Sequence, residues 1–245
     1  MSTGAGTASP RSAIVLGASG SVGGALMRAL LGSGAFSTVV TVGRTSQAAL
    51  LAEAKGARVA LREVLVPVMT PEQLQQATRD AVNALDGEVV GLSVLGIGAG
   101  TAKLTMAQHR DVDVALNAAF ARGLAASGKV RHLVFMSAVG ANTAASARGS
   151  GAAGTSRYNR VKGEAEAAVL ASGIAVVSVF RPAMIIGSRH TPRWLETLLP
   201  LFSWATPVQY RSIRVEQIAA AMVAAACHTP PASAVYHYGE MLAMA

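Results

Sequence analysis

The sequence predicts an α/β fold built on a doubly wound parallel sheet, with a small extension at its C-terminal end. Short apolar runs alternate with helical patterns along most of the chain, which is typical of strand–helix–strand units. These runs are almost continuously apolar, as strands are when helices cover both faces of a parallel sheet. The first run ends in a glycine-rich turn that opens a helix. Together these observations favour a Rossmann-type arrangement.

Six apolar runs have the length and composition of buried strands. They are residues 13–17, 38–42, 57–65, 89–95, 132–137 and 174–180. The helical patterns that connect and follow them are residues 21–31, 48–54, 70–85, 106–126, 156–171 and 215–227. The third helix has a clear start at Thr70-Pro71-Glu72, because proline is favoured at the first helical position.

Composition excludes several classes of protein. Hydrophobic residues make up 51% of the 245 residues and mean hydropathy is +0.41. No apolar stretch reaches the roughly 18 residues that a membrane span needs without a glycine, proline or polar break, so we expect no membrane partner. The formal charge is +8, but the arginines are scattered without a basic run, so we also expect no nucleic-acid partner.

The cysteine content and the start of the chain point to a cytoplasmic protein. Cys227 is the single cysteine, so no internal disulfide forms, and its alanine-rich helical surroundings favour a buried thiol over a nucleophile. The first residues are small and polar, without the basic region and apolar core of a signal peptide.

The turn after the first strand has the spacing Gly-x-x-Gly-x-x-Gly. Its residues are Gly17, Ala18, Ser19, Gly20, Ser21, Val22 and Gly23. A sharp turn and a backbone that approaches a pyrophosphate both require residues without side chains, and the helix N-terminus favours negative charge. Because the pattern follows a strand and opens a helix, it predicts dinucleotide binding.

The end of the second strand favours NADP(H) over NAD(H). An unphosphorylated adenosine ribose is usually held by a carboxylate at this point, whereas this chain has Arg44, which can pair with a 2′-phosphate. After the fourth strand, Leu95 and Gly96 lie at the edge where ligands bind, and we expect them to contact the cofactor. Gly98 and Gly100 fit a ligand-binding turn and a flexible loop about equally well.

A phenol and an ammonium are spaced four residues apart on the helix between the fifth and sixth strands. Tyr158 and Lys162 therefore share one helix face. A nearby positive charge favours the ionised form of a phenol, so the pair suits general acid–base catalysis, and the lysine can also hold a nicotinamide ribose.

These motifs, in this order, resemble the atypical short-chain dehydrogenase/reductases, and more narrowly the bacterial relatives of the human Tat-interacting protein and the NmrA-like NAD(P)-binding proteins. The stretches that carry the resemblance are the glycine turn, Leu95-Gly96, residues 132–142, residues 158–166 and Phe180-Arg181-Pro182. The resemblance covers roughly residues 12–225 and implies NADP(H) binding and a Ser-Tyr-Lys active site.

By that resemblance Tyr158 is the general acid/base, Lys162 orients the cofactor ribose, Ser137 binds the substrate oxygen and Pro182 contacts the cofactor. The sequence departs from the family at three places. Ala138 stands where relatives often have a second serine, no acidic residue follows the third strand, and Asp113 replaces an asparagine that often contacts cofactor. These departures bear more on turnover than on binding.

Three functions remain open at this point. The first is an NADP(H)-dependent oxidoreductase acting on a small-molecule carbonyl or alcohol; the second is a non-catalytic NADP(H) sensor; the third is an epimerase or isomerase of the sugar-nucleotide type. A metal site at His109, Asp111 and Asp113 is disfavoured, because residue 111 leaves the helix face that the other two share. No Gly-x-Ser-x-Gly elbow supports a hydrolase.

No linker in the sequence separates two cores, so we expect one domain over residues 12–245. Residues 1–11 are expected to form a disordered tail. Residues 183–245 form the substrate-side segment of this domain, where the strand–helix alternation stops. Within it, residues 194–204 suit a lid, a dimer face or core, which leaves a homodimer open. Residues 141–155, rich in Gly, Ala and Ser, predict a mobile surface loop.

Overall fold

A seven-stranded sheet forms the centre of the computed structural model, which describes residues 10–55, 58–187 and 207–245. The strand order is β3-β2-β1-β4-β5-β6-β9, and every neighbouring pair is parallel. The strands are β1 (Arg11–Leu16), β2 (Thr38–Gly43), β3 (Ala60–Leu65), β4 (Glu88–Ser93), β5 (Val130–Met136), β6 (Val176–Phe180) and β9 (Ala234–Tyr236). The predicted Rossmann-type fold is confirmed.

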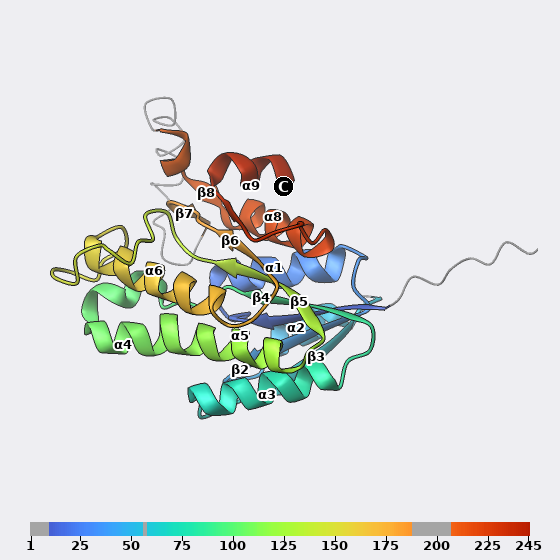
Figure 1. Ribbon diagram of the computed structural model, residues 1–245. Helices are drawn as coiled ribbons and strands as arrows, with labels where there is room; N and C mark the ends of the chain where they lie inside the picture. The colour runs from blue at the N-terminus through green and yellow to red at the C-terminus, as the bar shows by residue number, and fades with distance from the viewer. Residues whose placement is uncertain (1–9, 56–57, 188–206) are drawn as a thin grey trace, which may run out of the picture.

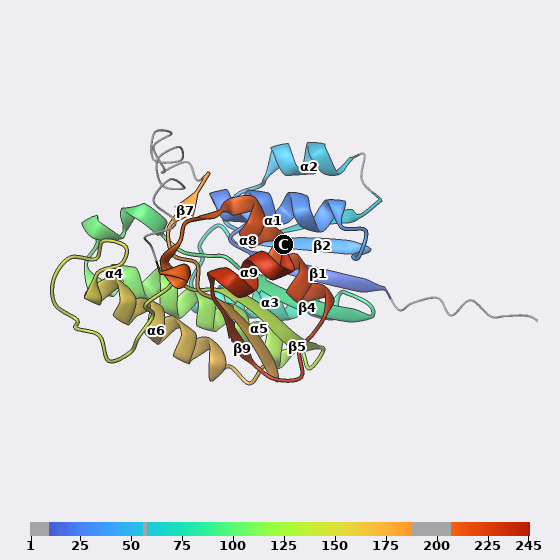
Figure 2. The same ribbon diagram turned by 90° about the horizontal axis from the view of Figure 1, so that it is seen from above.

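Helices cover both faces of this sheet (Figure 1). One face carries α1 (Ser21–Gly32), α2 (Ala48–Ala54), α8 (Val215–Cys227) and α9 (Tyr238–Met244). The other carries α3 (Pro71–Asn83), α4 (Met106–Arg110), α5 (Asn117–Ala126) and α6 (Ser156–Leu170). Seen from above, α2 lies beyond one edge of the sheet and β9 at the other (Figure 2).

The core has two layers because successive strand residues point to opposite faces. On β1, Ala13 and Val15 pack under α1 and α8, whereas Ile14 and Leu16 pack under α3 and α5. All four are at most 1% exposed. This two-sided burial explains why the strands read as continuous apolar runs rather than as alternating ones.

The predicted helix over residues 106–126 contains a segment of a different kind. Residues Asp111–Leu116, between α4 and α5, form the π-helical segment η2. A π-helical turn inserts a residue into the helix and shifts the side chains that follow, and such turns often occur at functional sites. Sequence periodicity over the whole stretch does not reveal it.

The C-terminal part adds elements that the sequence did not predict. β9 extends the sheet beyond β6, and a separate two-stranded sheet pairs β7 (Ile185–Ile186) with β8 (Ile213–Arg214). Two 3₁₀ helices, η1 (Gly98–Lys103) and η4 (Val208–Tyr210), complete the described elements. Gly98 and Gly100 thus belong to a short helix.

The predicted boundary of the tail at residue 11 is wrong, because Arg11 is the first residue of β1. Its guanidinium donates to Glu88 Oε2 at 2.8 and 3.0 Å and to the carbonyl oxygen of Cys227 at 2.7 Å. Burial raises the pKa of the partly covered Cys227 thiol, although Arg11 opposes that change.

Some predictions concern residues that the structure does not describe. Residues 194–204 lie outside them, so the three interpretations of that segment stay predictions. The predicted loop over residues 141–155 contains no helix or strand. Among the described helices, none is long and apolar enough to cross a membrane.

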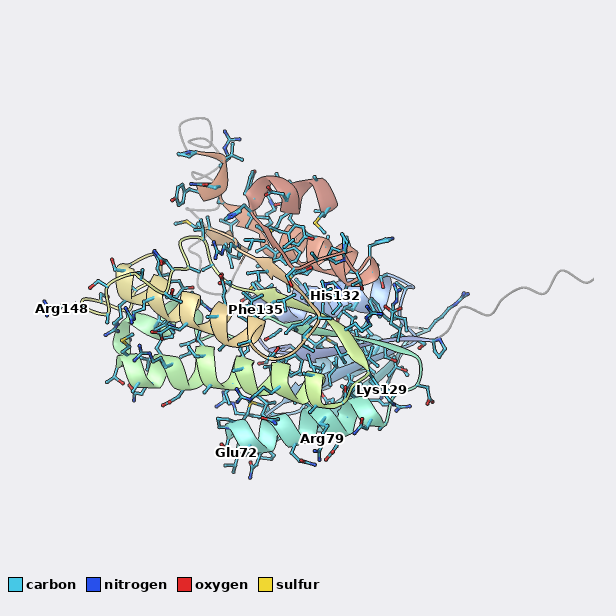
Figure 3. All side chains as sticks on the ribbon, viewed as in Figure 1. Glu72, Arg79, Lys129, His132, Phe135 and Arg148 are labelled. Carbon is cyan, nitrogen blue, oxygen red and sulfur yellow. The ribbon has the colours of Figure 1, made fainter. Side chains whose placement is uncertain are left out.

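His132 is a buried polar side chain inside the sheet (Figure 3). Its Nε2 lies 2.9 Å from Ser178 Oγ and its Nδ1 lies 3.3 Å from Thr229 Oγ1. Burial lowers the pKa of the imidazole from 6.5 to about 4, against the attraction of Glu88.

This depressed pKa predicts a pH-dependent stability. Between pH 6.5 and 4, His132 is protonated in the unfolded chain but stays neutral in the folded chain. The free energy of unfolding therefore falls as the pH drops from 6.5 towards 4. We expect a loss on the order of 3 kcal/mol between these two pH values. Urea unfolding across this range measures it. A His132→Gln variant should show a flatter dependence; an equal slope in both proteins would contradict the assignment.

Candidate functional site

The carboxyl ends of the strands form one edge of the sheet, and a groove with a volume of about 670 Å³ lies there. Ligands of open α/β sheets bind at this edge, where the strand order reverses between β1 and β4. The groove is lined by the turn after β1 and by the loops after β2, β3 and β4, together with one side of η2. The lining residues are Gly17, Ser19, Gly20, Arg44, Pro67, Met69, Pro71, Val94, Leu95, Gly96, Ile97, Asp111, Val112, Ala115 and Leu116.

The glycine turn after β1 leaves no room for side chains at two positions. Gly17 has φ +94°, and a Cβ there would lie 2.7 Å from the backbone nitrogen of Leu95. A Cβ on Gly23 would lie 2.1 Å from the carbonyl oxygen of Gly17. The side chains of Ala18 and Val22 pack in the core, whereas Gly17, Ser19 and Gly20 line the groove. The turn has the form needed to hold a pyrophosphate against the N-terminus of α1.

Arg44 follows β2 and is exposed at the mouth of the groove. The loop after it is fixed from β3: Ser46 Oγ and the backbone N–H of Gln47 each donate to the Glu63 carboxylate at 2.6 Å. The contact of this carboxylate could not be predicted from the sequence, because Glu63 lies within β3 and reaches the loop only through strand pairing.

Leu95 and Gly96 form the floor of the groove after β4. Buried Asn117 fixes this turn, since its Nδ2 donates to the carbonyl oxygens of Leu95 at 3.3 Å and Asp113 at 2.8 Å. Ser93 Oγ donates to Asn117 Oδ1. A Cβ on Gly96 would lie 3.1 Å from Lys162 Nζ, so the absence of a side chain at this position leaves room for the ammonium.

Tyr158 and Lys162 lie on one face of α6, as predicted. Lys162 Nζ is 5.7 Å from the centre of the Tyr158 ring, and the lysine is 5% exposed. Its ammonium donates to Asp113 Oδ1 at 2.5 Å. Burial lowers the pKa of Lys162, but the charge and hydrogen bond of Asp113, together with Tyr158 and Glu166, raise it, and the net pKa is raised. Burial raises the pKa of Asp113, but Lys162 and His109 lower it by more, so the net pKa falls to about 2.

Ion pairs hold α6 against its neighbours. Glu164 accepts two hydrogen bonds from the Arg110 guanidinium of α4, at 2.6 and 2.7 Å, and one from Arg160 at 3.0 Å. Near the end of β6, Arg181 binds the Glu166 carboxylate at 2.5 and 2.9 Å. Both pairs fix the direction of the helix that carries Tyr158 and Lys162.

Ser137 and Pro182 lie where β5 and β6 end. The Ser137 hydroxyl is buried and has no hydrogen-bond partner among the described residues, Tyr158 included. The chain here is held by its backbone, since Ser137 N–H donates to Phe180 O and Val139 N–H to Pro182 O. The structure therefore brings Lys162 against Gly96 of the groove lining, and among the described residues it forms no hydrogen bond between the Ser137 hydroxyl and Tyr158.

His109 was considered in the sequence only as a metal ligand. Its ring is fully buried, 5.7 Å from the Tyr158 ring centre, and Nε2 lies 3.7 Å from Asp113 Oδ2. Within residues 10–55, 58–187 and 207–245, no group of three or more His, Cys, Asp or Glu side chains could hold a metal ion. The four-residue spacing of His109 and Asp113 was the signal for this contact.

Comparison with known proteins agrees with the fold described above. Residues 17–229 match the family described as NAD(P)H-binding. Protein HTATIP2 of Rattus norvegicus is 30% identical over 202 residues, covering 82% of this chain and 74% of the rat protein.

Two solved structures show the same fold. A short-chain dehydrogenase/reductase from Serratia marcescens has a TM-score of 0.66 at 16% identity and covers 94% of this chain and 98% of its own. MoeE5 in complex with UDP-glucose and NAD has a TM-score of 0.63 at 16% identity, covering 95% of this chain and 80% of its own.

Proposed function

This chain belongs to the NAD(P)H-binding family, with the fold of the atypical short-chain dehydrogenase/reductases, and on that premise we propose that it is an NADP(H)-dependent oxidoreductase acting on a carbonyl or alcohol substrate. The observation that carries the proposal is the position of Lys162 Nζ, which lies against Gly96 of the groove lining and 5.7 Å from the centre of the Tyr158 ring. In this proposal a nucleotide cradle and an acid–base group lie close together.

Each residue has a distinct role in this proposal. The backbone of Gly17–Gly23 holds the pyrophosphate, and Lys162 holds the nicotinamide ribose. The rest of the cofactor is contacted by Leu95, Gly96 and Pro182. Bound NADP(H) supplies or accepts the hydride. Tyr158 gives a proton to the substrate oxygen during reduction and takes one during oxidation. Ser137, whose hydroxyl has no partner in the described structure, donates a hydrogen bond to that oxygen.

Arg44 supports NADP(H) over NAD(H). It is an exposed cation on the groove lining, and it can pair with a 2′-phosphate. Replacing Arg44 by alanine should weaken NADPH binding by about tenfold to a hundredfold, the value of a hydrogen bond to a charged group, and change NADH binding little. Calorimetric titration with both coenzymes measures this. An equal loss of affinity for NADPH and NADH would show that Arg44 does not bind the 2′-phosphate.

A substrate screen tests the proposed activity. Purified protein is mixed with NADPH and a panel of aldehydes, ketones and sugar nucleotides, and absorbance of the reduced nicotinamide is followed. Turnover that disappears in Tyr158→Phe supports the oxidoreductase. Tight NADPH binding without turnover on any member would instead favour the sensor, which the buried Ala138 already suggests. UDP-glucose belongs in the panel because MoeE5 binds it, and its conversion without net NADPH consumption would favour an epimerase.

A further inference from the structure

Asp113 occupies an unusual position for a carboxylate. It is 1% exposed, it lies in the π-helical segment η2, and its two oxygens face different groups. Oδ1 accepts a hydrogen bond from Lys162 Nζ, and Oδ2 accepts one from the backbone N–H of Ile97 at 3.2 Å. The carboxylate therefore bridges the helix that carries Tyr158 and the loop that floors the groove.

The surroundings of Lys162 explain why a carboxylate is needed there. An ammonium that is 5% exposed tends to lose its proton unless an opposite charge lies in contact with it. Asp113 supplies that charge, and Gly96 supplies the space, since a Cβ there would lie 3.1 Å from Nζ and 3.3 Å from Asp113 Oδ1.

His109 closes the remaining side of the carboxylate. The ring is fully buried, and neither ring nitrogen has a hydrogen-bond partner in the described part of the chain, although Nε2 is only 3.7 Å from Asp113 Oδ2. A buried polar group left without a partner is costly and calls for a functional explanation. The ring thus lies close to Asp113 and, at 5.7 Å between ring centres, to Tyr158.

We propose that Asp113 is a positioning residue of the reaction: acting through Lys162, it keeps the ammonium charged and holds it beside Gly96. The proposal rests on the proposed oxidoreductase function. It assigns the aspartate, which departs from the family pattern, a direct side-chain contact with the lysine. Two N–H donors of the ammonium remain for a ribose.

The first test observes Lys162 itself. Nitrogen-detected NMR of lysine ammonium groups reports those that exchange protons slowly, as buried ion pairs do. Besides Lys162 the chain has Lys55, Lys103 and Lys129, and Lys162→Arg identifies the Lys162 signal by its loss. In Asp113→Asn this signal should vanish or become that of a neutral amine at pH 7. Asp86→Asn, which removes an exposed carboxylate remote from the groove, should leave it unchanged. A Lys162 signal that persists in Asp113→Asn would overturn the proposal.

The second test separates positioning from a merely structural role. We expect Asp113→Asn to lower kcat about 100-fold, the usual result of a misplaced catalytic group, and NADPH affinity by less than about tenfold. In a Lys162→Met background, where the buried cation is gone, adding Asp113→Asn should change kcat and NADPH affinity less than twofold. A further large loss in that background would mean that Asp113 acts by another route.

The two proposals fail in different ways. If the wild-type protein does not bind NADPH, or if Tyr158→Phe keeps full turnover, the oxidoreductase assignment fails, while the NMR signal of Lys162 still reports whether Asp113 holds it. If binding and Tyr158-dependent turnover are present but Asp113→Asn retains both the signal and kcat, only the role of Asp113 is refuted.

Discussion

Tyr158→Phe is expected to lower turnover about 1,000-fold, within the range that general acid–base catalysis supplies, and to leave NADPH affinity within about threefold. The substitution removes one oxygen and retains the ring that contacts His109. Because the groove lining does not include Tyr158, the nucleotide keeps its other contacts.

Rates are measured at saturating NADPH with the best substrate of the screen, and affinity by calorimetry. Tyr210→Phe is the matched control, because Tyr210 is half exposed on η4 and outside the predicted catalytic group. Equal activity of Tyr158→Phe and the wild type would remove Tyr158 from the chemistry, whatever the cofactor affinity.

Gly23→Ala is expected to weaken NADPH binding at least about 100-fold. The added Cβ would lie 2.1 Å from the Gly17 carbonyl oxygen and 2.8 Å from the Ala18 backbone, so the turn itself must move. Displacing the turn removes the close backbone approach that a pyrophosphate needs. The atoms nearest to the added Cβ belong to the backbone, so no flexible side chain can move away to make room for it.

Gly24→Ala is the control for this substitution, since its Cβ would meet only the end of the Arg28 side chain at 3.9 Å. It lies in the same helical turn and should keep NADPH affinity while raising stability by up to about 1 kcal/mol, the helix propensity difference between alanine and glycine. Calorimetry and urea unfolding on both variants measure the two effects. Tight NADPH binding by Gly23→Ala would place the cofactor elsewhere.

The sheet was predictable because its strands are buried on both faces, which leaves continuous apolar runs in the sequence. β9 was missed because three residues, Ala234–Tyr236, carry too little pattern, and only pairing with β6 defines them. η2 was missed because a π-helical turn changes hydrogen bonding without changing residue type. Arg11 was assigned to the tail because its place in the strand is defined by pairing with β4 at Glu88, far along the chain.

The candidate site was predictable where its spacing is local. Gly17, Gly20 and Gly23 form one turn, and Tyr158 and Lys162 are one helical turn apart, so sequence spacing alone places them. The contact between Lys162 and Asp113 joins two helices 49 residues apart, and the contact between Glu63 and Gln47 joins two elements through the sheet. Such contacts require the packed fold.

A crystal structure of the protein with NADPH would show where each part of the nucleotide binds. We expect the pyrophosphate on the backbone of residues 18–23, the 2′-phosphate beside Arg44 and the nicotinamide next to Tyr158 and Lys162. A nucleotide bound with its nicotinamide away from Tyr158, or outside the groove below Gly17 and Gly96, would contradict this expectation.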